Sequence, residues 1–201
     1  DAESVALAWR MPTTVDDDVI SALISSILYN GQAGLLDVNL NQQQKVLGCF
    51  AGSLGLSDYY TYMISGQPKQ GQTLDEVKDL MLAEVEKLRK GEFDEELLQA
   101  TINNYKLYYM KQLESNESRA DMFVSAFVDG DQWSDVVNFI DKMSKVNKQQ
   151  VVDFANKYFA DNYALVYKRM GKDPNEKKMD KPSITPIVMN RDSVSSFLKE
   201  I

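Results

Sequence analysis

Histidine is absent from all 201 residues of this chain. It is the commonest protein ligand of metal ions and the usual general base near neutral pH. Its absence excludes Ser-His-Asp and Cys-His nucleophile pairs, the two-histidine metal-binding helix motifs, and iron or copper held by imidazole. An active site built from this chain alone would depend on carboxylates, lysine, tyrosine or one thiol.

Cysteine occurs once, at Cys49, so the chain forms no internal disulfide and its redox compartment stays undetermined. Cys49 lies between Gly48 and Phe50 in an apolar segment. Because no histidine can activate the thiol, a nucleophilic role is disfavoured. We expect Cys49 to be buried and unreactive.

Positive charge and long apolar runs are also scarce. Lys and Arg number 22 against 30 Asp and Glu, a net charge of −8, which disfavours nucleic acid and anionic membranes as partners. The longest weakly charged stretch, Val19 to Val38, contains serine, asparagine and glutamine, and is too polar to span a membrane. No glycine-rich phosphate loop is present, because Gly48, Gly52 and Gly55 lack the strand–turn–helix context that such loops need.

Residue periodicity predicts an α+β fold with an antiparallel or mixed sheet packed against several helices. Strands are expected at Val5–Met11, Val46–Leu54, Tyr59–Ser65 and Tyr163–Lys168, the second and third forming an antiparallel pair. Helices are expected after Asp16–Asp18, from Thr73 to Gly91, after Asp94, and over Asn116–Phe127, Ser134–Met143 and the segment following Asn147.

Helix-start signals are clear at three positions. Thr73 with Glu76, and Asn147 with Gln150, have the spacing of capping boxes. Asp94 is expected to cap the next helix with its side chain.

The expected strands and helices of residues 1–170 predict one α+β domain. Residues 171–201, with Pro174, Lys177, Lys178, Lys181, Pro182 and Pro186, predict a mixed-charge linker that leads into another element near Ser195–Ile201.

Several acidic and aromatic groups invite functional interpretations. Asp16–Asp18 could bind a hard cation, but the ligand spacing of a calcium loop is missing, and favourable interaction with a helix dipole explains both this run and Asp94–Glu96. Glu114, Glu117 and Asp121 could form an acid/base set, although a solvated helix face is the simpler interpretation.

Ligand stacking is possible for Tyr59, Tyr60 and Tyr62, whose strand would point them alternately inward and outward. Tyr105, Tyr108 and Tyr109 are expected to pack on a helix with solvated hydroxyls.

Six segments, in this order, resemble the pitrilysin/insulinase family of zinc metallopeptidases. They are LAWRMP (Leu7–Pro12), ISSILYNGQAGLL (Ile24–Leu36), KVLGCFAG (Lys45–Gly52), the helical stretch Gly71–Lys106, SNESRADMF (Ser115–Phe123), and Val146–Arg169. The tail from Tyr167 to Ile201 also resembles the join between the two halves of long bacterial members. The resemblance implies an α+β domain similar to those of mitochondrial processing peptidase.

In this family the zinc site lies in the first domain of a half, on a helix with H-x-x-E-H, and the second domain is catalytically silent. No part of that motif can be placed here. In the last domain of two-half members, an Arg and a Tyr seven residues apart reach the substrate; the matching positions here are Gln42 and Cys49. The resemblance therefore implies the non-catalytic second domain of the first half, followed by the start of a second half. No catalytic, cofactor-binding or metal-binding residue is assigned.

The resemblance implies a structural domain that encloses the peptide substrate of a zinc-dependent endopeptidase, with zinc in another domain of the parent protein. Its partners would be that catalytic domain or a partner subunit, and an unstructured peptide. The alternative is a binding or assembly domain of a catalytically inactive family subunit. A third option is an unrelated α+β scaffold. Bacterial relatives with similar tails are often exported, so the resemblance points to the periplasm or cell envelope.

Overall fold

A four-stranded antiparallel sheet organises the main part of the chain. Its strands are β1 (Ser4–Met11), β2 (Gly48–Gly55), β3 (Tyr60–Gln67) and β4 (Ala164–Lys168), in the order β2-β3-β1-β4. Alternate residues of β1 (Val5, Leu7, Trp9 and Met11) are buried, as expected for a strand with one face on a core. The predicted α+β class and the predicted β2–β3 pair are confirmed.

The computed structural model describes residues 2–12, 14–55, 59–172, 179–187 and 193–200. The chain divides into two compact units, Asp1–Met170 and Gly171–Ile201. Within the second unit, the described residues contain one short helix, α7 (Ser196–Lys199). Pro174, Lys177 and Lys178 of the predicted linker, and part of the turn between β2 and β3, lie outside the described residues.

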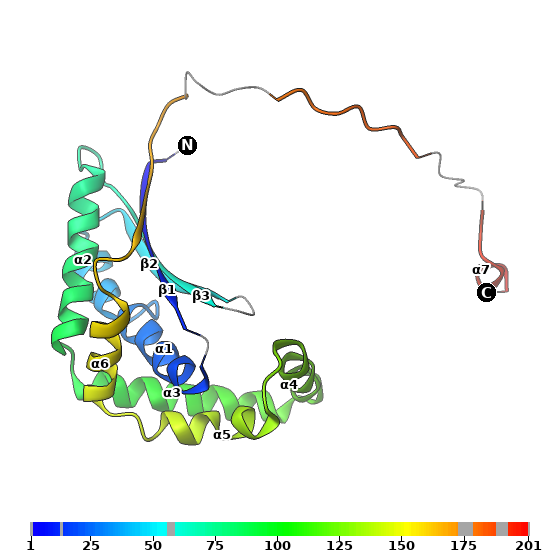
Figure 1. Cartoon of the computed structure of the whole chain (residues 1–201), viewed down its shortest axis with the longest axis horizontal. Coiled ribbons are helices and arrows are strands. Elements are labelled where there is room, and N and C mark those ends of the chain that lie inside the picture. Colours follow the sequence, from blue (N-terminus) through cyan, green and yellow to red (C-terminus); the bar gives the residue numbers. More distant parts are fainter. Residues whose placement is uncertain (1, 13, 56–58, 173–178, 188–192, 201) are drawn as a thin grey trace. The chain divides into compact units, whose positions relative to one another are not determined.

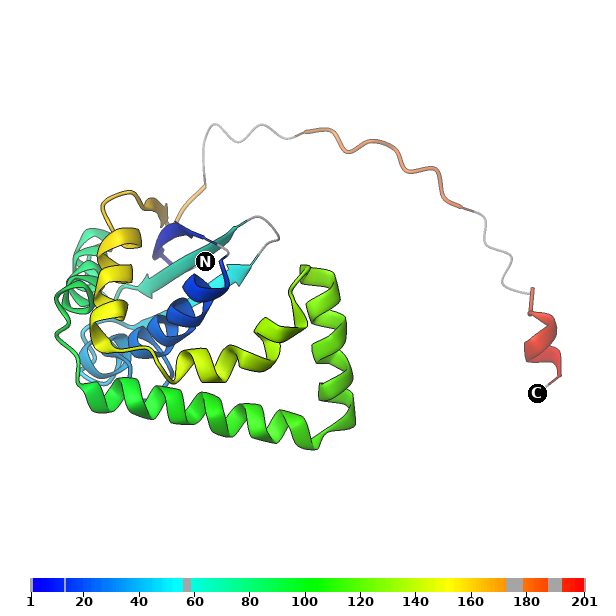
Figure 2. The same ribbon diagram turned by 60° about the horizontal axis from the view of Figure 1, so that its bottom comes forward.

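The first unit has six α-helices among its described residues. They are α1 (Val15–Leu28), α2 (Leu74–Lys90), α3 (Glu95–Glu114), α4 (Asn116–Asp129), α5 (Trp133–Met143) and α6 (Lys148–Tyr158), and a one-turn π-helix, η1 (Asp37–Asn41), follows α1. Helices α1, α2 and α6 pack on one face of the sheet (Figure 1). Helices α3, α4 and α5 form a further group that contacts α1 (Figure 2). No described helix covers the opposite face of the sheet.

The local sequence signals explain where these helices begin and end. Both capping boxes are present: the Thr73 and Asn147 side chains accept from the amides of Glu76 and Gln150, whose side chains accept in return. Helix α2 ends at Gly91, where φ is 71°, a conformation that glycine adopts without steric cost. The prediction for Asp94 was wrong in one respect, because it occupies the N-cap position of α3 without a side-chain hydrogen bond.

An aromatic cluster joins the two ends of the first unit. The ring of Trp9 lies 5.2 Å from Phe159 and 5.5 Å from Tyr163, and Tyr62 lies 5.3 Å from Phe159, measured between centroids. The indole Nε1 of Trp9 donates to the carbonyl of Ala160 at 2.9 Å, so this buried donor is satisfied. The cluster fixes β1 against the segment that leads from α6 into β4.

Close packing of β3 on α2 depends on Gly66. A Cβ at this position would lie 2.6 Å from Cγ1 of Val77 and 2.9 Å from Sδ of Met81. Both neighbours belong to the buried face of α2. The missing side chain therefore allows α2 to lie directly against the strand backbone.

Two buried carboxylates hold the segment around η1. Oδ2 of Asp37 accepts from the amides of Asn30, Gly31 and Gly34 at 2.9, 3.0 and 3.1 Å. Glu84 of α2 accepts from Asn39 Nδ2 at 2.6 Å and from Lys87 Nζ at 2.8 Å. Asp37 therefore stabilises the chain reversal after α1, and Glu84 connects η1 to α2. Both buried carboxylates have hydrogen-bond partners that account for their burial.

Candidate functional site

The described residues hold no recognisable catalytic centre. No group of three or more Cys, Asp or Glu in the described ranges could hold a metal ion, and the chain has no histidine. Cys49 is 3% exposed, and burial, followed by the negative charges of Asp37 and Glu84, raises the pKa of its thiol to about 12. The predicted burial of Cys49 is confirmed, and its thiol stays protonated at neutral pH.

The predicted acidic run starts a helix. Thr14 is the N-cap of α1 and its side chain accepts from the amide of Asp17, while Asp16 pairs with Lys142 of α5 at 3.3 Å. Asp18 differs from its neighbours because it is half-buried beside Asp131. Burial raises its pKa to about 6, and the charges of Asp131 and Asp17 act in the same direction. Asp17 therefore helps to start helix α1, Asp16 contacts α5, and Asp18 lies beside Asp131 in the segment between α4 and α5.

The expectation that Glu114, Glu117 and Asp121 share one helix face was wrong, because the helix is interrupted at Ser115. Glu114 is the last residue of α3, whereas Glu117 and Asp121 belong to α4. Tyr60 and Tyr62 are buried. This confirms the expectation that strand alternation turns part of the tyrosine group at the start of β3 inward. Tyr105 corrects a prediction: its hydroxyl is not simply solvated but donates to the carbonyl of Ala22 in α1 at 3.2 Å.

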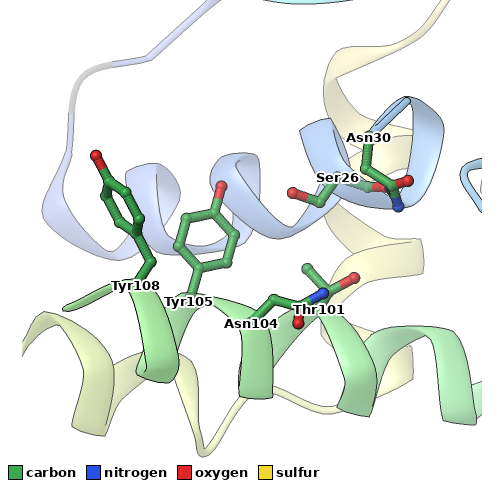
Figure 3. A pocket seen from close by; sticks show the side chains of 6 residues that line it. All are labelled: Ser26, Asn30, Thr101, Asn104, Tyr105 and Tyr108. Atoms are coloured by element: carbon green, nitrogen blue, oxygen red, sulfur yellow. Dashed lines mark hydrogen bonds between the residues drawn. The ribbon is translucent and has the colours of Figure 1, made fainter. Parts of the chain in front are cut away.

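A pocket of about 200 Å³, lined by polar and tyrosine residues, lies between α1 and α3. Figure 3 shows Thr101, Asn104, Tyr105 and Tyr108 on α3, with Ser26 of α1 and Asn30, which follows the end of α1, across the pocket. The wall offers hydroxyl and amide groups but no carboxylate, lysine or thiol. Such a wall can hydrogen-bond a neutral polar ligand and supplies no strong acid, base or nucleophile.

A second hollow lies where α3, α4 and α5 meet the start of α1. It consists of two adjoining pockets of about 260 and 280 Å³, which share Met122, Asp131 and Val136. We call it the acidic groove. Its remaining lining residues are Asp18, Tyr109, Asp135 and Phe139 in one pocket and Gln112, Ser118, Asp121, Ser125 and Ala126 in the other. Sequence spacing could not reveal it, because its acids come from three helices and from the segment between α4 and α5.

Apolar side chains are exposed on two surfaces of the first unit. On α4, Phe127 is 87% exposed, and Phe123, Val124 and Val128 are exposed with it. On the face of the sheet that no described helix covers, Phe50, Met63 and Val166 are exposed. Their exposure leaves apolar area in contact with water. No helix in the described part of the chain is long and apolar enough to cross a membrane.

Comparison with protein families gives one match. The model described as the peptidase M16 inactive domain matches residues 1–105, about half of the chain. The comparison with curated proteins finds no match.

Solved structures share the fold. A protease from Helicobacter pylori superposes with a TM-score of 0.75 at 24% identity, over 83% of this chain and 40% of that protein. The inactive peptidase domain of a candidate zinc protease from Bordetella parapertussis gives 0.74 at 20% identity, over 87% of this chain and 96% of that one. A periplasmic protease from Escherichia coli gives 0.63 at 12% identity, over 78% and 18% of the two chains. At these identities the likeness concerns the fold, and the chain spans less than half of the Helicobacter protein.

Proposed function

The chain belongs to the M16 (pitrilysin/insulinase) peptidase family as an inactive domain, and from this premise we propose that it encloses the peptide substrate of a zinc-dependent endopeptidase. The catalytic zinc would lie in another domain of the same parent protein or in a partner subunit. The family resemblance is confirmed by the match over residues 1–105, which contains the first three of the six segments and all but the last residue of the fourth.

The observation that carries this proposal is the combination of family membership with missing zinc ligands. The residues present do not fit a zinc site: the chain has no histidine, and Cys49 is buried within the sheet. Zinc in proteins is bound mainly by histidine, cysteine and carboxylate groups gathered around one point. No such group occurs among the described residues, so no catalytic step is assigned to this chain.

A silent domain can still contribute to hydrolysis by restricting the substrate. Holding a flexible peptide against a fixed wall lowers the entropic cost of reaching the reacting geometry. The pocket between α1 and α3 suits this role, because Ser26, Asn104 and Tyr108 bring hydroxyl and amide groups to its wall that match the polar groups of a peptide backbone. The Tyr105 hydroxyl and the Asn30 amide already bond to the backbone of this chain.

We place the domain in the first half of its parent. At the two positions where the last family domain carries substrate-reaching Arg and Tyr residues, this chain has Gln42 and Cys49. Nε2 of Gln42 donates to the carbonyl of Gln32 at 2.6 Å, and Cys49 is buried. Neither side chain supplies a cation or a phenol. The periplasmic location of the E. coli neighbour supports a cell-envelope location for this protein.

Hydrolysis of a quenched fluorescent peptide library tests the proposal. We expect the full-length parent to cleave peptides, a zinc chelator to abolish cleavage, and this 201-residue chain to be inactive. Elemental analysis of the purified chain should find far less than one zinc per molecule. Cleavage by the chain alone, or stoichiometric zinc bound to it, would contradict the proposal.

The alternative function, an assembly domain of an inactive family subunit, is favoured by one observation. The apolar residues on α4 and on the open sheet face would be removed from water by another protein surface. A parent protein without H-x-x-E-H and without peptidase activity when pure, which becomes part of an active complex with a second subunit, would select this alternative.

A further inference from the structure

Asn30 and Gly31 form the one Asn–Gly pair of the sequence, and they lie exposed in the turn that follows α1. Such pairs are chemically labile, because glycine has no side chain and its nitrogen can approach the preceding carboxamide. The nitrogen bonds to Cγ of the asparagine, the Cγ–Nδ2 bond breaks, and ammonia leaves with the amide proton. Water then opens the resulting succinimide ring to aspartate or isoaspartate. The structure of the turn decides how fast this reaction proceeds.

Hydrogen bonds hold the carboxamide of Asn30 at both of its polar atoms. Its Nδ2 donates to the carbonyl of Ser26 at 3.0 Å, and its Oδ1 accepts from the amides of Gln32 and Ala33 at 3.0 and 2.9 Å. Bond formation at Cγ makes this planar carbon tetrahedral, which displaces Oδ1 and Nδ2 from these partners. Because each lost hydrogen bond costs free energy, the closed turn opposes the reaction.

A buried carboxylate holds the attacking nitrogen. The Gly31 amide donates to Oδ2 of Asp37 at 3.0 Å, and the same oxygen accepts from the amides of Asn30 and Gly34. The nitrogen becomes a nucleophile only when it loses its proton and gains negative charge. Asp37 is 3% exposed, so water screens its charge weakly. A carboxylate at this distance therefore disfavours the deprotonated nitrogen, as one negative charge disfavours another.

We propose that Asn30 is a latent deamidation site, which Asp37 protects while the turn of residues 29–37 is closed and which reacts when the turn opens. The reaction is one-way in its structural effect. An aspartate product lacks the Nδ2 donor to Ser26, and it adds a negative charge near Asp37 and near the C-terminal end of α1. An isoaspartate product lengthens the backbone by one carbon, which moves the amides away from Asp37. Either product makes the turn close less well.

Peptide mapping by mass spectrometry tests the proposal on the 201-residue chain incubated at pH 8. A synthetic peptide of residues 27–39 supplies the unprotected rate. We expect Asn30 to react at least about tenfold more slowly in the folded chain than in the peptide, and urea should remove this protection. The variant D37N keeps the size of the side chain and removes its charge, and it should raise the rate at least about fivefold. Circular dichroism verifies that D37N is folded.

The variant D129N supplies a matched control within the same molecule. It places a second Asn–Gly pair before Gly130, whose φ of 77° is close to the 80° of Gly31. The Gly130 amide donates to the carbonyl of Ala126, which carries no net charge. We expect position 129 to deamidate at least about tenfold faster than Asn30 in one sample. If D37N does not fold, this comparison decides alone.

The variant N30D tests the structural effect of the modification. Its control is N138D, because Asn138 also donates to the carbonyl four residues earlier, that of Ser134, at 2.7 Å. N30D should unfold at a lower urea concentration than N138D, since only Asn30 also accepts two backbone amides and adjoins a buried carboxylate.

Equal rates in the folded chain and the peptide would overturn the proposed protection. So would an unchanged rate in folded D37N, or equal rates at positions 30 and 129 of D129N. If N30D and N138D unfold at the same urea concentration, the one-way effect is wrong.

Discussion

Asn41 satisfies both backbone groups of Cys49. Its Nδ2 donates to the Cys49 carbonyl at 2.7 Å, and its Oδ1 accepts from the Cys49 amide at 2.8 Å. Strand β2 lies at the edge of the sheet, so these groups have no neighbouring strand on that side. The side chain of Asn41, at the end of η1, thus replaces a strand at one position of the edge.

Replacing Asn41 with alanine should lower the free energy of unfolding by about 1–3 kcal/mol, because it leaves a partly buried amide and carbonyl without partners. Urea denaturation of the 201-residue chain measures this change. Gln43→Ala is the control, since Gln43 is exposed in the same loop. Equal stability of the two variants would mean that water replaces Asn41 at no cost.

The thiol of Cys49 should resist modification in the folded protein. With its pKa at about 12, the reactive thiolate is scarce at pH 8, and burial blocks access to the sulfur. A colorimetric thiol reagent should label the chain only as fast as it unfolds, and completely in urea. Rapid labelling under native conditions would show that β2 opens locally.

Gly66→Ala should destabilise the domain by roughly 1–3 kcal/mol, because the added methyl overlaps Val77 and Met81. The double variant Gly66→Ala/Val77→Ala should recover part of the loss, since it removes the atom nearest to the new methyl. Gly52→Ala, also in a strand but with nothing within 4 Å of its Cβ position, is the control and should be nearly neutral. Thermal unfolding distinguishes these variants.

Asp18→Asn should stabilise the protein at neutral pH. The pKa of Asp18 is raised from 3.8 to about 6 in the folded state, so its ionisation above pH 6 opposes folding. The gain should be roughly 1 kcal/mol, a value reduced because the side chain is only half-buried. It should be complete above about pH 6 and disappear as the pH falls toward 3.8.

Urea unfolding between pH 4 and 8 measures this difference. Asp129→Asn serves as the control for the loss of one exposed charge. A gain that grows as the pH falls would have the wrong sign and would show that the environment of Asp18 favours its charged form.

Local chemistry made most of the fold predictable. Thr73 with Glu76 and Asn147 with Gln150 start helices through contacts three residues apart, and Gly91 ends α2 through its own backbone conformation. Alternation in β1 gave the buried face of the sheet. These signals act within a few positions, so the sequence displays them directly.

The features that were missed depend on tertiary contacts. The π-helix η1 was not predicted; it is held by Asp37 and by Asn39, whose partner Glu84 lies on α2. The acidic groove joins Asp18 of α1 to Asp131 and Asp135, more than 100 positions later. Taken singly, each of these acids is explained by its place near the start or end of a helix. Only their juxtaposition across helices distinguishes them from solvated surface charges.

The contact between Trp9 and Ala160 spans 151 positions, and β1 pairs with both β3 and β4. During synthesis, β1 therefore leaves the ribosome long before its last partner exists. At typical translation speeds of about 5–20 residues per second, it waits roughly 10–30 seconds. Until β4 arrives, one edge of β1 and the indole of Trp9 stay uncovered, so a nascent chain that stops before residue 160 is a natural target for chaperones and proteases.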